Sequence, residues 1–187
     1  MELNTYPLVC TRGVVLYPNQ EIVIDVGRGA SVHAVENAQD NYDKKICLFS
    51  QKELEQENPG KEDIYPVGTL CEVRHIRRFD NFLRVKFRGI KRVKLNNWIN
   101  GSLSDLAEVE ILESEKQDAV EEEALIRMIA DELDRMQGQD RFVTKEIVME
   151  ISKGMGGEFL SDKAVQGLPL DIERKQQYLE TLGVNDR

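Results

Sequence analysis

The lysines and arginines between residues 74 and 94 are the side chains of this sequence best placed to do chemistry. This segment holds nine basic residues and one acidic residue, although the whole chain of 187 residues has a net charge of -9. Within it, Arg84, Lys86 and Arg88 alternate with apolar residues, so a β-strand would place the three cations on one face, about 6–7 Å apart. Such a row can hold an acidic peptide segment or a chain of phosphates. The alternative is a solvated strand face whose charge prevents pairing with other strands.

Motifs for phosphate binding and for hydrolysis do not accompany these cations. The segment Gly27–Ser31 lies between a predicted strand and a predicted helix, but it has no third glycine, and no Gly-Lys-Ser/Thr sequence occurs. Neither the dinucleotide-binding fingerprint nor the P-loop is therefore present. The Gly-x-Ser-x-Gly turn of a serine hydrolase is also absent. We predict that this chain has no catalytic residues and binds no cofactor, so an independent enzyme is the least favoured class.

Metal binding and membrane insertion are not indicated either. The cysteines, Cys10, Cys47 and Cys71, include no Cys-x-x-Cys pair, and with His33 and His75 they form no familiar zinc-binding spacing, so we predict no metal site. Each cysteine lies in an apolar run and is predicted to be a buried thiol, which indicates a reducing, cytoplasmic compartment. No apolar run approaches the roughly 20 residues that a transmembrane helix needs.

Strands that can position the basic segment are predicted throughout residues 1–113. Long strands joined by hairpins, with one early helix, predict a small, closed or half-closed antiparallel sheet. Turns are predicted at Asp80-Asn81 and at Asn100-Gly101. The predicted strands are Tyr6–Cys10, Glu21–Val26, Ile46–Phe49, Gly68–Arg78, Phe82–Leu95 and Leu103–Leu112, and the predicted helix is Ser31–Asn41.

Residues 114–187 are predicted to form a helical subdomain. A capping box is predicted at Ser114–Gln117, and Asp171 is predicted to cap the helix that ends at Leu182. Apolar stripes at helical spacing predict two further helices: one contains Leu125, Ile129, Leu133 and Met136, and the other contains Val143, Ile147 and Ile151. The last residues, 184–187, are predicted to be frayed because so few residues cannot nucleate a helix.

The chain contains an ordered series of distinctive short segments: Pro7–Val9, Arg12–Pro18, Val26–Arg28, Lys44–Lys52, Tyr65–Thr69, Leu83–Arg92, Leu168–Leu170 and Lys175–Glu180. This series resembles the N-terminal domain of the Lon ATP-dependent protease family. The series spans nearly the whole chain, and no single segment decides it. Two positions depart from the family pattern: Arg88 stands where an acidic residue is usual, and Gly13 stands where aspartate is usual.

The resemblance implies an α+β fold, with a PUA-like antiparallel β pseudo-barrel over residues 1–113 followed by an α-helical subdomain over residues 114–187 that is truncated at its C-terminal end. It implies a non-catalytic region that captures unfolded, damaged or tagged proteins for degradation and helps a homohexamer to assemble. The ATPase, with its ATP and Mg, and the Ser–Lys peptidase of such a protease would lie outside these residues.

Two surfaces are the candidate substrate-binding sites. Leu16, Tyr17 and Pro18 are predicted to form an exposed apolar surface that binds the hydrophobic segments of unfolded chains. Arg84, Lys86 and Arg88 would add selectivity for charge. Two alternatives stay open: a naturally short, stand-alone adaptor of the same fold, and a PUA-like module that binds nucleic acid through the basic segment. No membrane partner is expected.

Overall fold

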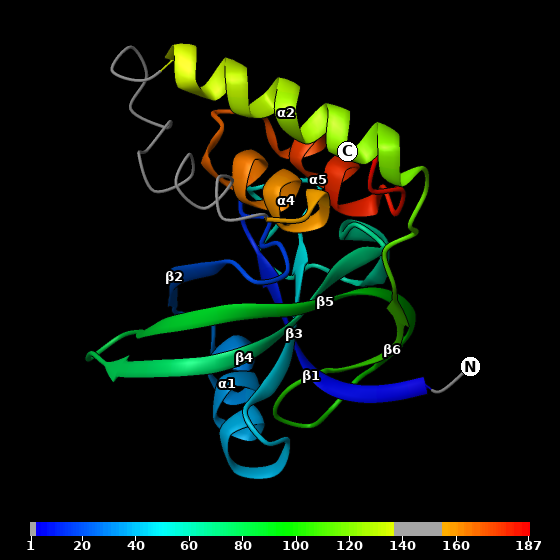
Figure 1. The fold of residues 1–187 in the computed structure, drawn as a ribbon. Coiled ribbons are helices and arrows are strands. Elements are labelled where there is room, and N and C mark those ends of the chain that lie inside the picture. Colours follow the sequence, from blue (N-terminus) through cyan, green and yellow to red (C-terminus); the bar gives the residue numbers. More distant parts are fainter. Residues whose placement is uncertain (1–2, 137–154) are drawn as a thin grey trace. The chain divides into compact units, whose positions relative to one another are not determined.

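The computed structural model describes residues 3–136 and 155–187, and it divides the chain into two compact units, Met1–Leu112 (the β unit) and Glu113–Arg187 (the helical unit) (Figure 1). The β unit contains β1 (Leu3–Thr11), β2 (Glu21–Val26), α1 (Gly29–Asn41), β3 (Lys45–Ser50), the short 3-10 helix η1 (Lys61–Asp63), β4 (Val67–Arg78), β5 (Leu83–Ile99) and β6 (Leu106–Leu112). The helical unit contains α2 (Ala119–Met136), α4 (Gly157–Gly167) and α5 (Ile172–Glu180).

The strands of the β unit close into a barrel. In the described part of the chain, six strands form one sheet in the order β2-β5-β4-β3-β1-β6, and β5 also pairs with β6. The long strand β5 makes this closure possible, because Leu83–Arg88 pairs with β2 and Arg92–Ile99 pairs with β6. The predicted α+β pseudo-barrel is confirmed. The sheet is mixed rather than wholly antiparallel, because β1 and β3 run parallel.

One of the two predicted turns joins its strands tightly. At Asp80-Asn81, the backbone N–H of Phe79 donates to the carbonyl of Phe82 at 2.9 Å, which confirms the predicted hairpin turn. The second predicted turn, at Asn100-Gly101, was expected to lead directly into a strand beginning at Leu103, which is too early in the sequence. In the structure β5 ends at Ile99 and β6 begins at Leu106, so Asn100-Gly101 opens a longer connection.

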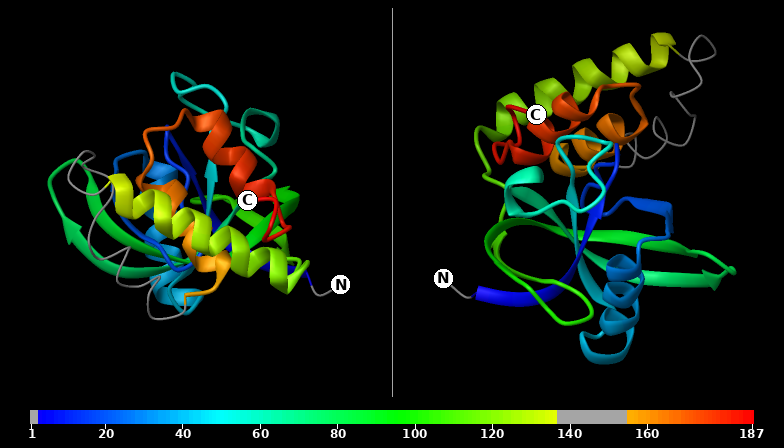
Figure 2. Two further views of the ribbon diagram at one scale, coloured as in Figure 1. Left: turned by 45° about the horizontal axis from the view of Figure 1, so that its top comes forward. Right: turned by 180° about the vertical axis from the view of Figure 1, so that it is seen from behind.

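Two apolar clusters hold the β unit together, because successive residues of a strand face opposite sides of the sheet. On β1, Leu8 belongs to one cluster and Val9 to the other. The helix α1 packs against β1 and β3 (Figures 1 and 2) and buries Ala34, Val35 and Ala38 in the second of these clusters.

The cysteines of the β unit are weakly reactive thiols. Cys47 and Cys71 are fully buried, as predicted, whereas Cys10 is half-buried. Burial raises the pKa of the Cys10 thiol to about 12 and raises the pKa of Cys47 and of Cys71 as well. All three side chains are therefore protonated at neutral pH.

In the helical unit, local hydrogen bonds define where the helices begin. Asp171 caps α5, as predicted, by accepting a hydrogen bond from the N–H of Arg174 at 2.8 Å. The predicted capping box at Ser114 is wrong. The carboxylate of Asp118 accepts hydrogen bonds from the N–H groups of Val120 and Glu121 instead, because α2 begins later, at Ala119.

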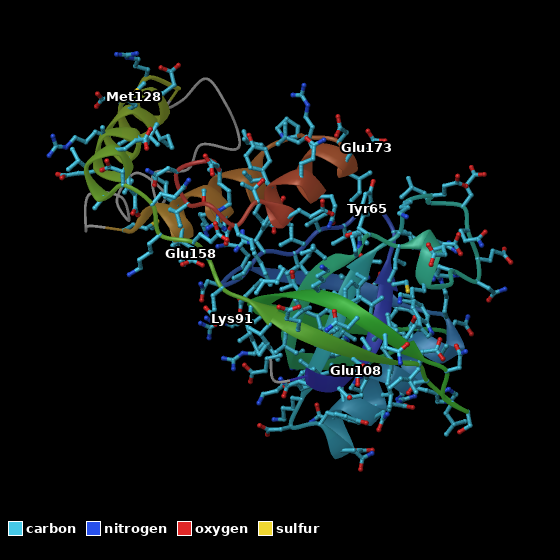
Figure 3. The ribbon with its side chains drawn as sticks, turned by 90° about the vertical axis from the view of Figure 1, so that its right-hand side faces the viewer. Tyr65, Lys91, Glu108, Met128, Glu158 and Glu173 are labelled. Carbon is cyan, nitrogen blue, oxygen red and sulfur yellow. The ribbon has the colours of Figure 1, made fainter. Side chains whose placement is uncertain are left out.

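Apolar contacts within the helical unit join α2 to α4. Ile126 and Ile129 pack against the buried Leu160. On the other side of α2, Met128 is 67% exposed (Figure 3). The predicted apolar stripe at Val143, Ile147 and Ile151 lies outside the described residues.

The predicted fraying of residues 184–187 is wrong. The N–H of Val184 donates to the carbonyl of Glu115 at 3.1 Å, and the Val184 side chain is buried. The guanidinium of Arg187 forms an ion pair with Asp162, in which the two side chains are 1% and 3% exposed. These residues are ordered by tertiary contacts with the first residues of the unit and with α4, so they do not need to nucleate a helix.

Candidate functional site

The basic stripe, Arg84, Lys86 and Arg88, lies on one face of β5. The alternation of charged and apolar residues predicts this arrangement, and the structure agrees with it, because the intervening Val85 and Phe87 are fully buried. Two of the three cations already have carboxylate partners on β2. Asp25 accepts two hydrogen bonds of 2.7 Å from Arg84, and Glu21 lies 2.6 Å from the Lys86 ammonium. Hydrogen bonds from Arg84 and Lys86 lower the pKa of Asp25 and of Glu21, respectively.

Replacing Arg84, Lys86 and Arg88 together by Gln is expected to lower the melting temperature by only about 5 °C or less, because exposed ion pairs contribute little stability. Thermal denaturation followed by circular dichroism measures this. Because the pKa of Asp25 is lowered by folding, the small contribution is present at neutral pH and disappears as the pH falls below about 4. Binding of peptides with several acidic residues should weaken and become less dependent on salt concentration. A large loss of stability would contradict the exposed position of these side chains.

The prediction that Leu16, Tyr17 and Pro18 form an exposed apolar surface is wrong. Leu16 is 3% exposed, Tyr17 is 0% exposed, and Pro18 is buried. The segment is held inside the β unit by its backbone, since the Leu16 carbonyl accepts a hydrogen bond from the Thr69 hydroxyl and the Tyr17 carbonyl accepts one from the N–H of Gln20. The apolar run Leu16–Pro18 therefore belongs to the core of the β unit.

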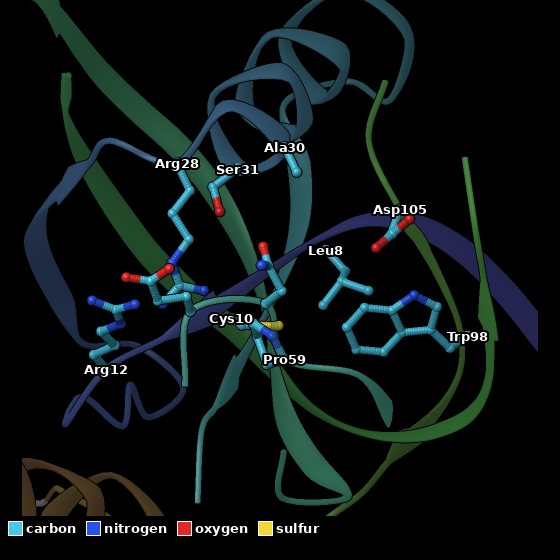
Figure 4. Close-up of a pocket in the computed structure, with 11 residues that line it drawn as sticks. Leu8, Cys10, Arg12, Arg28, Ala30, Ser31, Pro59, Trp98 and Asp105 are labelled. Carbon is cyan, nitrogen blue, oxygen red and sulfur yellow. The ribbon is translucent and has the colours of Figure 1, made fainter. Parts of the chain in front are cut away.

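A groove in the β unit runs beside β1 and the start of α1, with β2 along one part of it and Glu57–Pro59, Trp98 and Asp105 along the other. It consists of two adjoining hollows of about 410 Å³ and about 360 Å³, which share Cys10, Arg12, Arg28 and Ser31. These volumes fall in the range of roughly 300–1,000 Å³ that is typical of ligand sites. In the larger hollow, Arg12 and Arg28 lie toward one end, and Trp98 and Asp105 lie toward the other (Figure 4).

A buried glutamine holds Arg28 in this groove. Gln51 is fully buried, and its amide nitrogen donates to the carbonyls of Glu53 and Gln56 at 3.2 and 2.9 Å. Its amide oxygen is therefore turned toward Arg28, from which it accepts a hydrogen bond. The Gln56 carbonyl also accepts a hydrogen bond from Arg12 at 3.3 Å, so one loop positions both guanidinium groups.

Residues 5–187 match the family model of the ATP-dependent protease La (LON) substrate-binding domain. The chain belongs to this family. The predicted resemblance is thereby confirmed.

Curated relatives of this LON domain are named Lon protease. The protein of Buchnera aphidicola subsp. Acyrthosiphon pisum is 30% identical over 187 residues, which are 100% of this chain and 24% of that protein. The protein of Syntrophomonas wolfei is 33% identical over 190 residues, which cover 100% of this chain and 23% of that protein. This chain therefore spans about a quarter of the length of these relatives.

Solved structures share the fold of this LON domain. The N-terminal domain of Mycobacterium avium complex Lon protease matches with a TM-score of 0.77 and 16% identity, covering 98% of this chain and 93% of that chain. A Lon N-terminal domain protein from Xanthomonas campestris matches with a TM-score of 0.66 and 15% identity, covering 97% of this chain and 92% of that one.

The groove of the LON domain was not predicted from the sequence. The sequence pattern places Arg28 in a strand-to-helix turn and Arg12 in a segment of the family resemblance, and it predicts a binding role for neither. The partner that positions both, the loop after Gln51, is remote from them in the sequence. Over residues 3–136 and 155–187, no cluster of His, Cys, Asp or Glu can hold a metal ion. No helix in those ranges is long and apolar enough to cross a membrane.

Proposed function

We propose that this LON domain captures unfolded or damaged protein segments for an ATP-dependent protease and performs no catalysis itself. The observation that carries this proposal is the match to the substrate-binding domain family over residues 5–187. The groove beside Arg12 and Arg28 supports it, because its hollows have the size of a ligand site and are lined by both apolar and charged side chains.

The finer features of the protease are part of the same proposal. The relatives are named Lon protease. We infer that the protein acts in cytoplasmic quality control as a homohexamer, with a Ser–Lys peptidase. ATP and Mg would bind to an ATPase domain outside these residues. Repetition of one weak binding domain around a ring would increase the overall affinity for a long unfolded chain, because later contacts become intramolecular.

A titration with one protein in its native form and in a permanently unfolded, reduced and alkylated form tests this function. We expect weak binding of the unfolded form and almost no binding of the native form, because only the unfolded chain presents extended apolar segments. Fluorescence anisotropy of the labelled partner, with the 187-residue chain as titrant, measures both affinities. Equal affinity for the two forms would contradict the proposal.

Nucleic-acid binding is the less favoured alternative. Four cations of the basic segment pair with carboxylates in the described residues: Arg74 with Glu72, Arg78 with Glu36, Arg84 with Asp25, and Lys86 with Glu21. Each such pair must be broken before the cation can replace counterions on a phosphate backbone. A binding constant for RNA or DNA that falls steeply with salt concentration would favour this alternative instead.

A further inference from the structure

At Cys10, one edge of β1 has no neighbouring strand among the described residues and borders the groove. The antiparallel pairing of β1 with β6 runs from Leu3 to Pro7, and the N–H of Leu8 still donates to the Asp105 carbonyl at 3.2 Å. On the other side of β1, the Thr11 carbonyl accepts a hydrogen bond from the N–H of Gln51, beside β3. In a parallel pair, alternate residues face opposite neighbours. The backbone amide and carbonyl of Cys10 therefore face away from β3.

This open edge coincides with the junction of the two hollows, because Cys10 lines both of them. An exposed strand edge of this kind can pair with the backbone of an extended peptide. Folded proteins have few extended segments with unpaired backbone groups, whereas unfolded chains have many. Pairing at Cys10 would therefore favour unfolded chains over folded ones.

The two arginines of the groove lack acidic partners. In the described ranges, neither Arg12 nor Arg28 forms an ion pair, and each guanidinium donates to a neutral oxygen, that of Gln56 or Gln51. Burial lowers the pKa of Arg28, and the nearby positive charge of Arg12 lowers it further. A guanidinium has five N–H donors, so each arginine can also bind an anion. Arg28 is half-buried and Arg12 is exposed, and two neighbouring cations with neutral partners favour a carboxylate ligand.

Apolar side chains flank the arginines on both sides. Leu8, Pro59 and Trp98 line the first hollow, and Val14 and Ile24 line the second. Arg12 and Arg28 line both hollows, so they lie where the two meet. A ligand with its charge at this junction meets apolar side chains in both directions, and in the first hollow it also meets the polar Glu57, Asn58 and Asp105. A side-chain carboxylate within a peptide fits this arrangement better than a carboxylate at its C-terminus.

We propose that the groove binds an extended polypeptide segment in which one Asp or Glu side chain is flanked on each side by apolar residues. The inference rests on the proposed function and specifies its substrate class. The carboxylate lies between Arg12 and Arg28, the backbone pairs with Cys10, and the flanking apolar side chains occupy the two hollows.

Substitution of Glu57 should change the binding of an acidic segment in the opposite direction to substitution of the two arginines. This carboxylate lines the first hollow, and its charge raises the pKa of Arg28, but it forms no ion pair with either arginine. It therefore competes electrostatically with a bound carboxylate. The Glu57→Gln variant should bind an acidic segment more tightly than the unchanged chain does, whereas Arg12→Gln and Arg28→Gln should bind it more weakly.

The experiment uses the 187-residue chain and fluorescently labelled ten-residue peptides with blocked termini. The test peptide carries one Glu between apolar residues, and the matched peptide carries Gln at that position. A third peptide carries Gln and a free C-terminal carboxylate. We expect the Glu peptide to bind about tenfold more tightly than the blocked Gln peptide, with a preference that weakens as salt is added. Arg12→Gln and Arg28→Gln should each remove most of this preference, and Arg174→Gln on α5 should leave it unchanged.

The possible results distinguish failure of the groove assignment from failure of the proposed function. Equal binding of the Glu and Gln peptides, no binding of either, or arginine variants that keep the preference would overturn the groove assignment. Stronger binding of the free-carboxylate peptide would overturn it in favour of a C-terminal pocket. If the chain nevertheless distinguishes unfolded from native protein, the proposed function stands without this groove. Circular dichroism verifies that each variant is folded. If Arg28→Gln does not fold, the groove assignment is tested by Arg12→Gln and by the comparison of the Glu and Gln peptides.

Discussion

The Asp162→Asn substitution is expected to destabilise the helical unit by about 3–5 kcal/mol, the usual cost of removing one member of a buried ion pair. The Asp162 carboxylate lies 3.4 Å from the Arg187 guanidinium, and the two side chains are 3% and 1% exposed. Asparagine has nearly the same shape as aspartate but no charge. The variant would therefore replace the charged partner of a buried guanidinium, which also donates to the Ser114 hydroxyl at 3.0 Å, with a neutral amide.

Urea denaturation followed by circular dichroism measures this loss. The matched control is Glu123→Gln, which removes a carboxylate from an ion pair on α2 whose side chains are 75% and 65% exposed. That control should cost less than about 1 kcal/mol because water screens the exposed pair. If both substitutions have equal effects, the buried position of Arg187 and Asp162 is wrong, and the order of the last residues does not depend on this pair.

Features that depend on neighbouring residues could be predicted from the sequence. The alternation around Val85 and Phe87 fixes which side chains of β5 face water, since successive residues point to opposite faces of a strand. Asp171 reaches only to the N–H of Arg174, and the turn at Asp80-Asn81 closes with one hydrogen bond. In each case the deciding contact lies within a few residues, so one short segment contains the necessary information.

Features that depend on distant segments could not be predicted. An apolar run such as that at Leu16 and Tyr17 has the same composition whether it is exposed for binding or buried by strands far away in the sequence. The order of Val184 depends on its hydrogen bond with Glu115. The groove likewise depends on Gln51, which lies beyond α1 and β3 from Arg28. The family resemblance predicts the barrel, but it does not predict these long-range contacts.

The Gly89→Ala substitution is expected to destabilise the β unit by about 3 kcal/mol or more, because the added methyl group has no free space. A Cβ at position 89 would lie 2.2 Å from the carbonyl oxygen of Tyr17 and 2.9 Å from its carbonyl carbon. Both are backbone atoms, so no side-chain rotation can relieve the overlap. The backbone is also fixed by hydrogen bonds of 2.9 Å, from the N–H of Gly89 to Gln20 and from the N–H of Asn19 to Gly89.

The matched control for this close approach is Gly29→Ala at the start of α1. A Cβ there meets nothing within 4 Å, and alanine favours a helix more than glycine does, so the control should be neutral or slightly stabilising. Urea denaturation of the three proteins, followed by circular dichroism, compares their free energies of unfolding. Gly89→Ala should unfold at a much lower urea concentration than Gly29→Ala. Coincident transitions would mean that β5 does not approach the Tyr17 backbone in solution, and Leu16–Pro18 would again become a candidate exposed surface.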